Sequence, residues 1–125
     1  MSLLLDTHAL LWWLADSPEL SHEARTAIAD EDEDVFVSIA TAWEISIKRS
    51  LGRMETPDDL GEQLERHRFD LLPITLSHVS LTGRLPLLHR DPFDRMLIAQ
   101  AMTNGLTLVT RDRNIARYDV SVLPA

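Results

Sequence analysis

The chain has 125 residues and a formal net charge of −8, from 20 acidic and 12 basic side chains, a balance that does not favour nonspecific binding to polyanions. This length suits one domain, residues 1–125, and the absence of cysteine excludes disulfides and thiolate metal sites. The sequence has neither a signal-peptide pattern nor an apolar run of about 20 residues, so we expect a cytoplasmic protein without a membrane segment.

Short apolar runs alternate with helix-like segments along the chain. Strands are predicted over 2–5, 35–37, 69–74, 106–109 and 120–122, and Pro73 favours an edge position for the third. Helices are predicted over 7–15, 20–29, 38–51, 57–66, 75–82 and 91–104, with a helical turn or two in 111–117. The first helix is hydrophobic nearly all round and is expected to be buried. The alternation predicts an α/β fold, a three-layer α/β/α sandwich around a central, mainly parallel sheet of four to five strands.

Five acidic residues lie where these elements meet. Asp6 follows the first strand, and Asp112 follows the fourth. Glu44 lies in the second turn of the helix after the second strand, while Asp91 and Asp94 lie in the first turn of the helix before the fourth. The carboxyl ends of parallel strands and the N-termini of the crossover helices share one edge of the sheet. All five acids are therefore predicted at that edge, where open α/β sheets bind ligands.

Four of these acids also have a structural interpretation. Asp6 suits the cap of the helix that follows it. Asp91 and Asp94, on either side of a proline at the first helical position, form a good helix start by themselves. Asp112 alone fits an exposed turn. The position of each of these four acids, taken alone, does not decide between a structural and a functional role.

Glu44 is harder to explain as a structural residue. It is the only charged residue in 38–47, and it is predicted to share a helix face with apolar side chains. A carboxylate in such a place costs several kcal/mol unless it is paired or bound to a cation. A capping box with Thr41 is the rival interpretation, but Ser38 already suits the helix start and leaves Glu44 too deep in the helix. We therefore favour a functional role for Glu44.

Taken together, the acids predict a site for a divalent cation. With no lysine certain to neutralise them, four or five carboxylates at one edge repel one another, and such a cluster normally persists around a hard cation. Carboxylate oxygens and water are the ligands that Mg²⁺ and Mn²⁺ prefer. Two such ions about 4 Å apart can activate a water and stabilise the leaving oxygen of a phosphodiester. We therefore expect Mg²⁺, or else Mn²⁺, as the cofactor.

Four blocks of the sequence resemble PIN-domain ribonucleases, and specifically the VapC-type toxins of type II toxin–antitoxin pairs. The blocks are LDTHALLW at 5–12, the pattern SxxTAWEI at 38–45, RDPFDRMLIAQA at 90–101 and LVTRD at 108–112. One acidic motif alone would be weak, but four in this order and at these separations are specific. The resemblance runs nearly from end to end of the chain.

The resemblance implies a fold, an activity and a site. It implies a PIN-like central parallel sheet and a Mg²⁺- or Mn²⁺-dependent endoribonuclease that acts on RNA as a toxin. It also implies a homodimer and a small cognate antitoxin that blocks the site. The family's acidic site corresponds to Asp6, Glu44, Asp94 and Asp112, with Asp91 as an auxiliary residue near the metal. We expect Asp6 and Asp94 to hold the principal ion, with Glu44 and Asp112 completing the cluster.

One position departs from the family pattern, and three arginines lie close to the acids. Many relatives carry Asn where this chain has His8, which we interpret as a surface or packing residue. Residues 84–125 hold six arginines and four acids, so the last third of the chain is locally basic. Arg95, Arg111 and Arg113 are predicted to position the RNA backbone, because phosphate contacts generally come from Arg and Lys. The alternative is that they are solvated surface residues.

Other functions remain open at this point. A phosphatase would use Asp6 as a nucleophile, although the second Asp expected two residues on is replaced by His8. A metal-dependent receiver-like or protein-binding module needs a well-placed lysine, and the only lysine, Lys48, is on a predicted helix. A non-catalytic PIN-like module would bind only a partner, but its four acids are intact.

The adjacent Trp12 and Trp13 bear on partners. Two neighbouring tryptophans on one short helix cannot both face the same core. One interpretation has one of them facing a neighbouring element and the other a dimer or antitoxin surface. The alternative is that both are buried in a three-layer domain.

Overall fold

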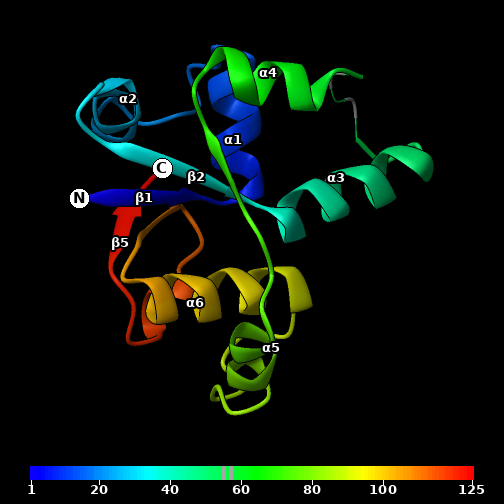
Figure 1. Ribbon diagram of the computed structural model, residues 1–125, viewed down its shortest axis with the longest axis vertical. Helices are drawn as coiled ribbons and strands as arrows, with labels where there is room; N and C mark the ends of the chain where they lie inside the picture. The colour runs from blue at the N-terminus through cyan, green and yellow to red at the C-terminus, as the bar shows by residue number, and fades with distance from the viewer. Residues whose placement is uncertain (55, 57) are drawn as a thin grey trace.

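The structure, a computed structural model, describes residues 1–54, 56 and 58–125. In this part of the chain, parallel strands form one sheet in the order β3-β2-β1-β4-β5 (Figure 1). The strands are β1 (Ser2–Leu5), β2 (Asp34–Ser38), β3 (Asp70–Leu72), β4 (Thr107–Thr110) and β5 (Val122–Pro124). The three-layer, parallel α/β fold predicted from the sequence is confirmed.

The central strand β1 is buried on both faces because its core-facing side chains are all leucine. Leu3 and Leu5 pack into the core on one face of the sheet, and Leu4 packs into the core on the other. From β1 the chain builds β2 and β3 on one side, then crosses to build β4 and β5 on the other. The strand order therefore reverses between β1 and β4, and ligands of such sheets bind at this switch point.

Helices cover both faces of the sheet (Figure 1). They are α1 (Thr7–Leu14), α2 (His22–Ala29), α3 (Ile39–Ser50), α4 (Leu60–Arg66), α5 (Leu76–Thr82) and α6 (Pro92–Asn104), with a 3₁₀ turn at Ile115–Arg117. Buried side chains of α1 to α4 pack in the core with Leu3 and Leu5, and those of α6 pack in the core with Leu4. None of the helices in the described residues is long and apolar enough to cross a membrane.

Local chemistry at the helix ends explains why the predicted boundaries agree with the structure. The side chains of Ser21, Ser38 and Asp91 each accept a backbone N–H in the first turn of α2, α3 and α6. Gly105 ends α6 in the left-handed conformation, with φ at 65°, which glycine adopts without strain. Polar caps and this glycine are local signals, so the sequence carries them directly.

Several elements differ from the prediction. β3 spans only Asp70–Leu72, although it does lie at an edge, as Pro73 suggested. The predicted start of α4 at Pro57 lies outside the described residues. The expectation that α1 is buried all round is wrong for its second half, because residues 11–14 are only partly buried.

Candidate active site

A pocket of about 460 Å³ opens beside the ends of β1 and β4, and we call it the acid pocket. All five predicted acids line it, together with other side chains, and the full lining is Asp6, Thr7, His8, Trp12, Glu44, Lys48, Asp91, Asp94, Arg111 and Asp112. The parallel topology thus brings together acids that are far apart in sequence. That they serve as metal ligands stays a prediction.

Asp6 serves as a helix cap and also lines the pocket. Its Oδ1 accepts the N–H of Ala9 at 2.8 Å, which caps α1, and the residue is only 7% exposed. Burial raises the pKa of the Asp6 carboxyl, and hydrogen bonds from Thr110 and Ala9 oppose that rise. The structural and functional interpretations of Asp6 therefore do not exclude each other.

Glu44 is buried, and both of its carboxylate oxygens are paired. The Thr7 hydroxyl donates to Oε1, and the Lys48 ammonium donates to Oε2 at 2.7 Å. This hydrogen bond is the main cause of the raised pKa of Lys48. Lys48 therefore neutralises one of the acids, a pairing that the sequence did not make certain. The i, i+4 spacing of Glu44 and Lys48 on one helix was the signal that predicts this pair.

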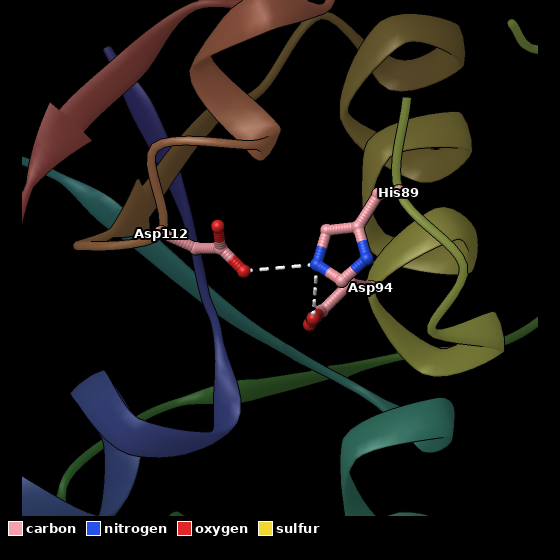
Figure 2. Close-up of side chains that lie close together, drawn as sticks. All are labelled: His89, Asp94 and Asp112. Atoms are coloured by element: carbon pink, nitrogen blue, oxygen red, sulfur yellow. Dashed lines mark hydrogen bonds and ion pairs between the residues drawn. The ribbon is translucent and has the colours of Figure 1, made fainter. Parts of the chain in front are cut away.

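Asp94 and Asp112 meet on the other side of the acid pocket, with a histidine between them. Figure 2 shows the ring of His89 between the two carboxylates. Its Nε2 lies 2.9 Å from Asp94 Oδ2 and 2.8 Å from Asp112 Oδ2. Asp112 is held further by the N–H of Asn114, which donates to Oδ1 at 2.8 Å. One histidine therefore joins the start of α6 to the loop after β4.

Burial and neighbouring charges both act on the Asp94 carboxyl. Burial, then the Asp91 carboxylate, raise the pKa of Asp94 to about 7, while His89 lowers it and Asp6 and Glu44 add smaller increases. Asp91 itself caps α6, since its Oδ1 accepts the N–H groups of Phe93 and Asp94 at 2.8 and 3.2 Å. The acids therefore repel one another, as a site prepared for a cation does.

His89 was not among the residues predicted from the sequence. It lies in the loop between α5 and α6, where no hydrophobic period or capping pattern singles out one residue. Hydrogen bonds from Tyr118 and Arg95 hold this loop. Tyr118 lies far from the loop in sequence, and Arg95 lies beyond the start of α6. The only sequence signal was its place two residues before Asp91, immediately before the third of the acidic blocks.

The three arginines predicted to contact RNA have different environments. The Arg95 guanidinium donates to backbone carbonyls of Thr82, Leu85, Pro86 and His89. Because its donors hold the loop before α6, Arg95 has a structural task, and its contact with RNA stays a prediction.

Arg111 lines the acid pocket, while Arg113 is exposed after Asp112. Arg111 is also tied to the C-terminus and to α1, since its Nε donates to the carbonyl of Ala125 and its guanidinium lies 4.4 Å from the centre of the Trp12 ring. Neither arrangement removes Arg111 or Arg113 from the candidate RNA contacts.

The tryptophans are divided between two environments. Trp13 donates from Nε1 to His67 Nδ1 at 3.2 Å and packs against Phe69, whereas Trp12 lines the acid pocket. Trp13 therefore faces a neighbouring element, as one interpretation predicted. His8 is exposed at the pocket rim, with its ring centre 5.7 Å from that of Trp12.

A second, larger hollow of about 550 Å³ has no acidic residue in its lining, and we call it the apolar groove. It lies between α3, α6 and the loop before α6, and its apolar lining includes Trp43, Ile74, Leu87, Phe93 and Met96. Trp43 is 60% exposed and Leu87 is 72% exposed. An exposed apolar lining of this kind is typical of a surface that binds another protein, whereas the smaller acid pocket carries the titratable side chains.

The donor set of the acid pocket fits a hard divalent cation. Asp6, Glu44, Asp94 and Asp112 supply only oxygen, and burial, followed by the neighbouring Asp91 carboxylate, raises the pKa of Asp94. Lys48 neutralises the charge of Glu44, and Asp6 has no cationic partner among the ion pairs of the described residues. Carboxylate oxygens gathered in this way are ligands that hard divalent cations prefer.

The fold and the acid pocket define a class: parallel α/β/α domains with a cluster of carboxylates at the switch point of the sheet. Residues 3–121 match the model of the PIN domain family. The chain is also 31% identical over 122 residues to the ribonuclease VapC22 of Mycobacterium tuberculosis, covering 94% of this chain and 92% of that protein. The chain belongs to the PIN-domain family.

Solved structures share the fold at low sequence identity. One is a chain in the crystal structure of VapBC2 from Rickettsia felis bound to a DNA fragment from their promoter, with a TM-score of 0.74, 13% identity and 98% coverage of both chains. Another is in a toxin–antitoxin complex from Klebsiella pneumoniae, with a TM-score of 0.67, 18% identity and coverage of 97% of this chain and 95% of that one. Both support the fold described above.

Proposed function

We propose that this protein is a Mg²⁺- or Mn²⁺-dependent endoribonuclease and the toxin of a toxin–antitoxin pair. The observation that carries the proposal is the acid pocket, in which four carboxylates of a PIN-domain chain meet at the switch point of the sheet. The likeness to a ribonuclease over nearly the whole chain supports RNA as the substrate.

Each acid has a task in this mechanism. Asp6 and Asp94 would hold the principal ion, and Glu44 and Asp112 would complete its surroundings directly or through water. When bound, the ion supplies an activated nucleophile at neutral pH and charge stabilisation at the scissile phosphate. Asp94, with its pKa raised to about 7, must give up a proton before it can serve as an anionic ligand. Asp91 caps α6 and thereby fixes the backbone that carries Asp94.

Basic side chains at the pocket would receive the RNA backbone. Lys48 lies against Glu44 with 37% of its side chain exposed, and Arg111 lines the same pocket. Arg113 is exposed immediately after Asp112. Phosphate contacts of this kind position a nucleic acid without reading its sequence. Exposed loops around the pocket are therefore the place where the choice of RNA would be made.

The partners of the toxin are a small antitoxin and a second copy of the chain. Solved structures that share the fold include toxin–antitoxin complexes, which supports the antitoxin. The apolar groove, with Trp43 and Leu87 exposed, offers a surface of the kind that protein partners bury. Size exclusion of the purified chain at several concentrations tests the homodimer, and a strict monomer throughout would contradict it.

The proposal is tested by cleavage of RNA by the purified chain with Mg²⁺, with Mn²⁺ and with a chelator. Cleavage is expected with either metal and is abolished by chelation and by Asp6→Asn, which keeps the shape of the side chain. Undiminished cleavage by the Asp6→Asn protein would contradict the assignment. Hydrolysis of a small phosphomonoester instead of RNA would favour the phosphatase alternative, in which Asp6 is the nucleophile. Sequencing the RNA ends produced on induction would identify the RNA that is cut.

A further inference from the structure

His89 lies inside the acid pocket's network but has no task in the mechanism above. Its Nε2 and one oxygen each of Asp94 and Asp112 lie within 4.8 Å of one another (Figure 2). This spacing is compatible with two different roles. His89 is either a third ligand of the ion or a hydrogen-bond donor that arranges the two carboxylates.

The other ring nitrogen decides between these roles. The backbone N–H of Asp91 donates to His89 Nδ1 at 3.1 Å, so Nδ1 is an acceptor and carries no proton. A neutral imidazole then has its proton on Nε2, which is hydrogen-bonded to Asp112 Oδ2 at 2.8 Å and lies 2.9 Å from Asp94 Oδ2. A protonated nitrogen has no lone pair to offer a metal. Histidines that bind metals instead donate from their second ring nitrogen to an acceptor, which is the opposite of this arrangement.

Hydrogen bonds hold the backbone of His89 at both its N–H and its carbonyl. Its N–H donates to the Tyr118 hydroxyl at 2.9 Å, and its carbonyl accepts from Arg95 at 3.2 Å. The Tyr118 hydroxyl in turn donates to the carbonyl of Pro86 at 2.6 Å, and Tyr118 is buried. The His89 side chain is 13% exposed. The ring is therefore fixed by its surroundings before any ion arrives.

We propose that His89 is a positioning residue whose Nε2–H holds the carboxylates of Asp94 and Asp112 together for the divalent ion, without coordinating the ion. The inference rests on the proposed function, because it assumes that these carboxylates bind metal. The Nε2–H, hydrogen-bonded to Asp112 and close to Asp94, offsets the repulsion that otherwise separates the two carboxylates. Without it, the ion must bring the two side chains together itself. Losses of about 10- to 100-fold in metal affinity are typical when such a supporting group is removed.

The first test is the dissociation constant for Mn²⁺, measured on the full chain from the electron paramagnetic resonance signal of the free ion. His89→Leu removes the donor, and His89→Gln keeps a side-chain N–H. His22→Leu is the matched control, since it makes the same change at an exposed histidine on α2 that does not line the acid pocket. We expect His89→Leu to bind Mn²⁺ about 10- to 100-fold more weakly, His89→Gln to recover most of the loss, and His22→Leu to match the wild type.

The second test needs no variant and reads the tautomer directly. Nitrogen-15 spectra of the wild-type histidines, recorded without and with saturating Mg²⁺, are expected to keep the His89 proton on Nε2. A proton that moves to Nδ1 with Mg²⁺ would make His89 a ligand and overturn the proposal. Wild-type affinity in His89→Leu, or equal losses in His89→Leu and His89→Gln, would also overturn it.

Asp94→Asn in the same Mn²⁺ titration separates the two proposals. If Asp94→Asn binds Mn²⁺ as the wild type does, the metal site itself is wrong. If Asp94→Asn loses Mn²⁺ while His89→Leu keeps it, only the role of His89 is wrong.

Discussion

The two sides of the acid pocket are built in different ways. On one side, Asp6 and Glu44 are held by their own helices and their neighbours: Ala9 lies three residues after Asp6, and Lys48 lies four residues after Glu44. On the other side, Asp94 and Asp112 are joined by a histidine from a loop without regular structure. The first side depends mainly on local helix geometry, to which Thr7 and Thr110 add hydrogen bonds from other elements. The second side depends on contacts between distant parts of the chain.

This difference separates two sources of order in one site. Helix caps and i, i+4 pairs form wherever their helices form, so the Asp6 side is prepared by secondary structure. The Asp94 side requires the loop before α6 to be in place, and Tyr118 and Arg95 hold that loop. We therefore expect substitutions on the two sides to differ in their effects on RNA cleavage and on the free energy of unfolding.

The largest effect is expected at Asp94. The Asp94→Asn variant should lose at least about 100-fold in RNA cleavage, because a bound ion contributes several kcal/mol to the transition state. The same variant should be more stable than the wild type without metal at pH 8, because a buried carboxylate among like charges is removed. Cleavage rates and thermal unfolding in the presence of a chelator measure the two effects. A variant that is less stable as well as inactive would contradict the assignment.

Asp91→Ala is the matched control for this experiment, since it removes the neighbouring acid of the same helix start. It should lower the free energy of unfolding by about 1 kcal/mol through loss of the α6 cap, and keep most of the cleavage.

A smaller effect is expected from pH on the metal-free protein. The pKa of Asp94 is about 7 in the fold, against 3.8 ordinarily, so the folded state holds a proton that the unfolded state releases between these values. The contribution of Asp94 to the free energy of unfolding is therefore largest below pH 3.8. It falls by about 2 to 4 kcal/mol as pH rises through about 7. Thermal unfolding with a chelator from pH 5 to 8 measures the fall. A profile that Asp94→Asn leaves unchanged would show that another group is responsible.

The smallest effect is expected on the Glu44 side. Lys48→Met leaves the buried Glu44 carboxylate without its cation, and should destabilise the metal-free protein by about 1 to 3 kcal/mol. Arg49→Met is the matched control, because the ion pair of Arg49 with Asp58 is exposed and should contribute less than about 1 kcal/mol. Mg²⁺ should reduce the loss in Lys48→Met if Glu44 faces the ion. Equal losses in both variants would mean that the Glu44–Lys48 pair acts as a surface pair.

The strands and helices were largely predictable from the sequence because their signals are local. The leucine run of β1, the serine caps of α2 and α3, and the Asp91 cap with Gly105 at the far end of α6 all mark boundaries close to those in the structure. Where the prediction was too long, as at β3, an apolar run continued past the residues that pair with β2.

The site was predictable only in part, because some of its contacts leave no local signal in the sequence. Topology alone places the acids at one edge of the sheet, so Asp6, Glu44, Asp94 and Asp112 were found. Contacts that join a loop to distant elements leave no periodic signal. His89 was therefore missed, and so was the part that Arg95 takes in holding the loop.

The most direct measurement is a crystal structure of the wild-type protein soaked with Mn²⁺, in which anomalous scattering locates the ion. The account predicts an ion in the acid pocket at about 2.1 to 2.3 Å from carboxylate oxygens of Asp6 and Asp94, with His89 still hydrogen-bonded to the carboxylates rather than bound to the ion. An acid pocket without an ion at saturating Mn²⁺, or an ion bound elsewhere on the protein, would contradict it.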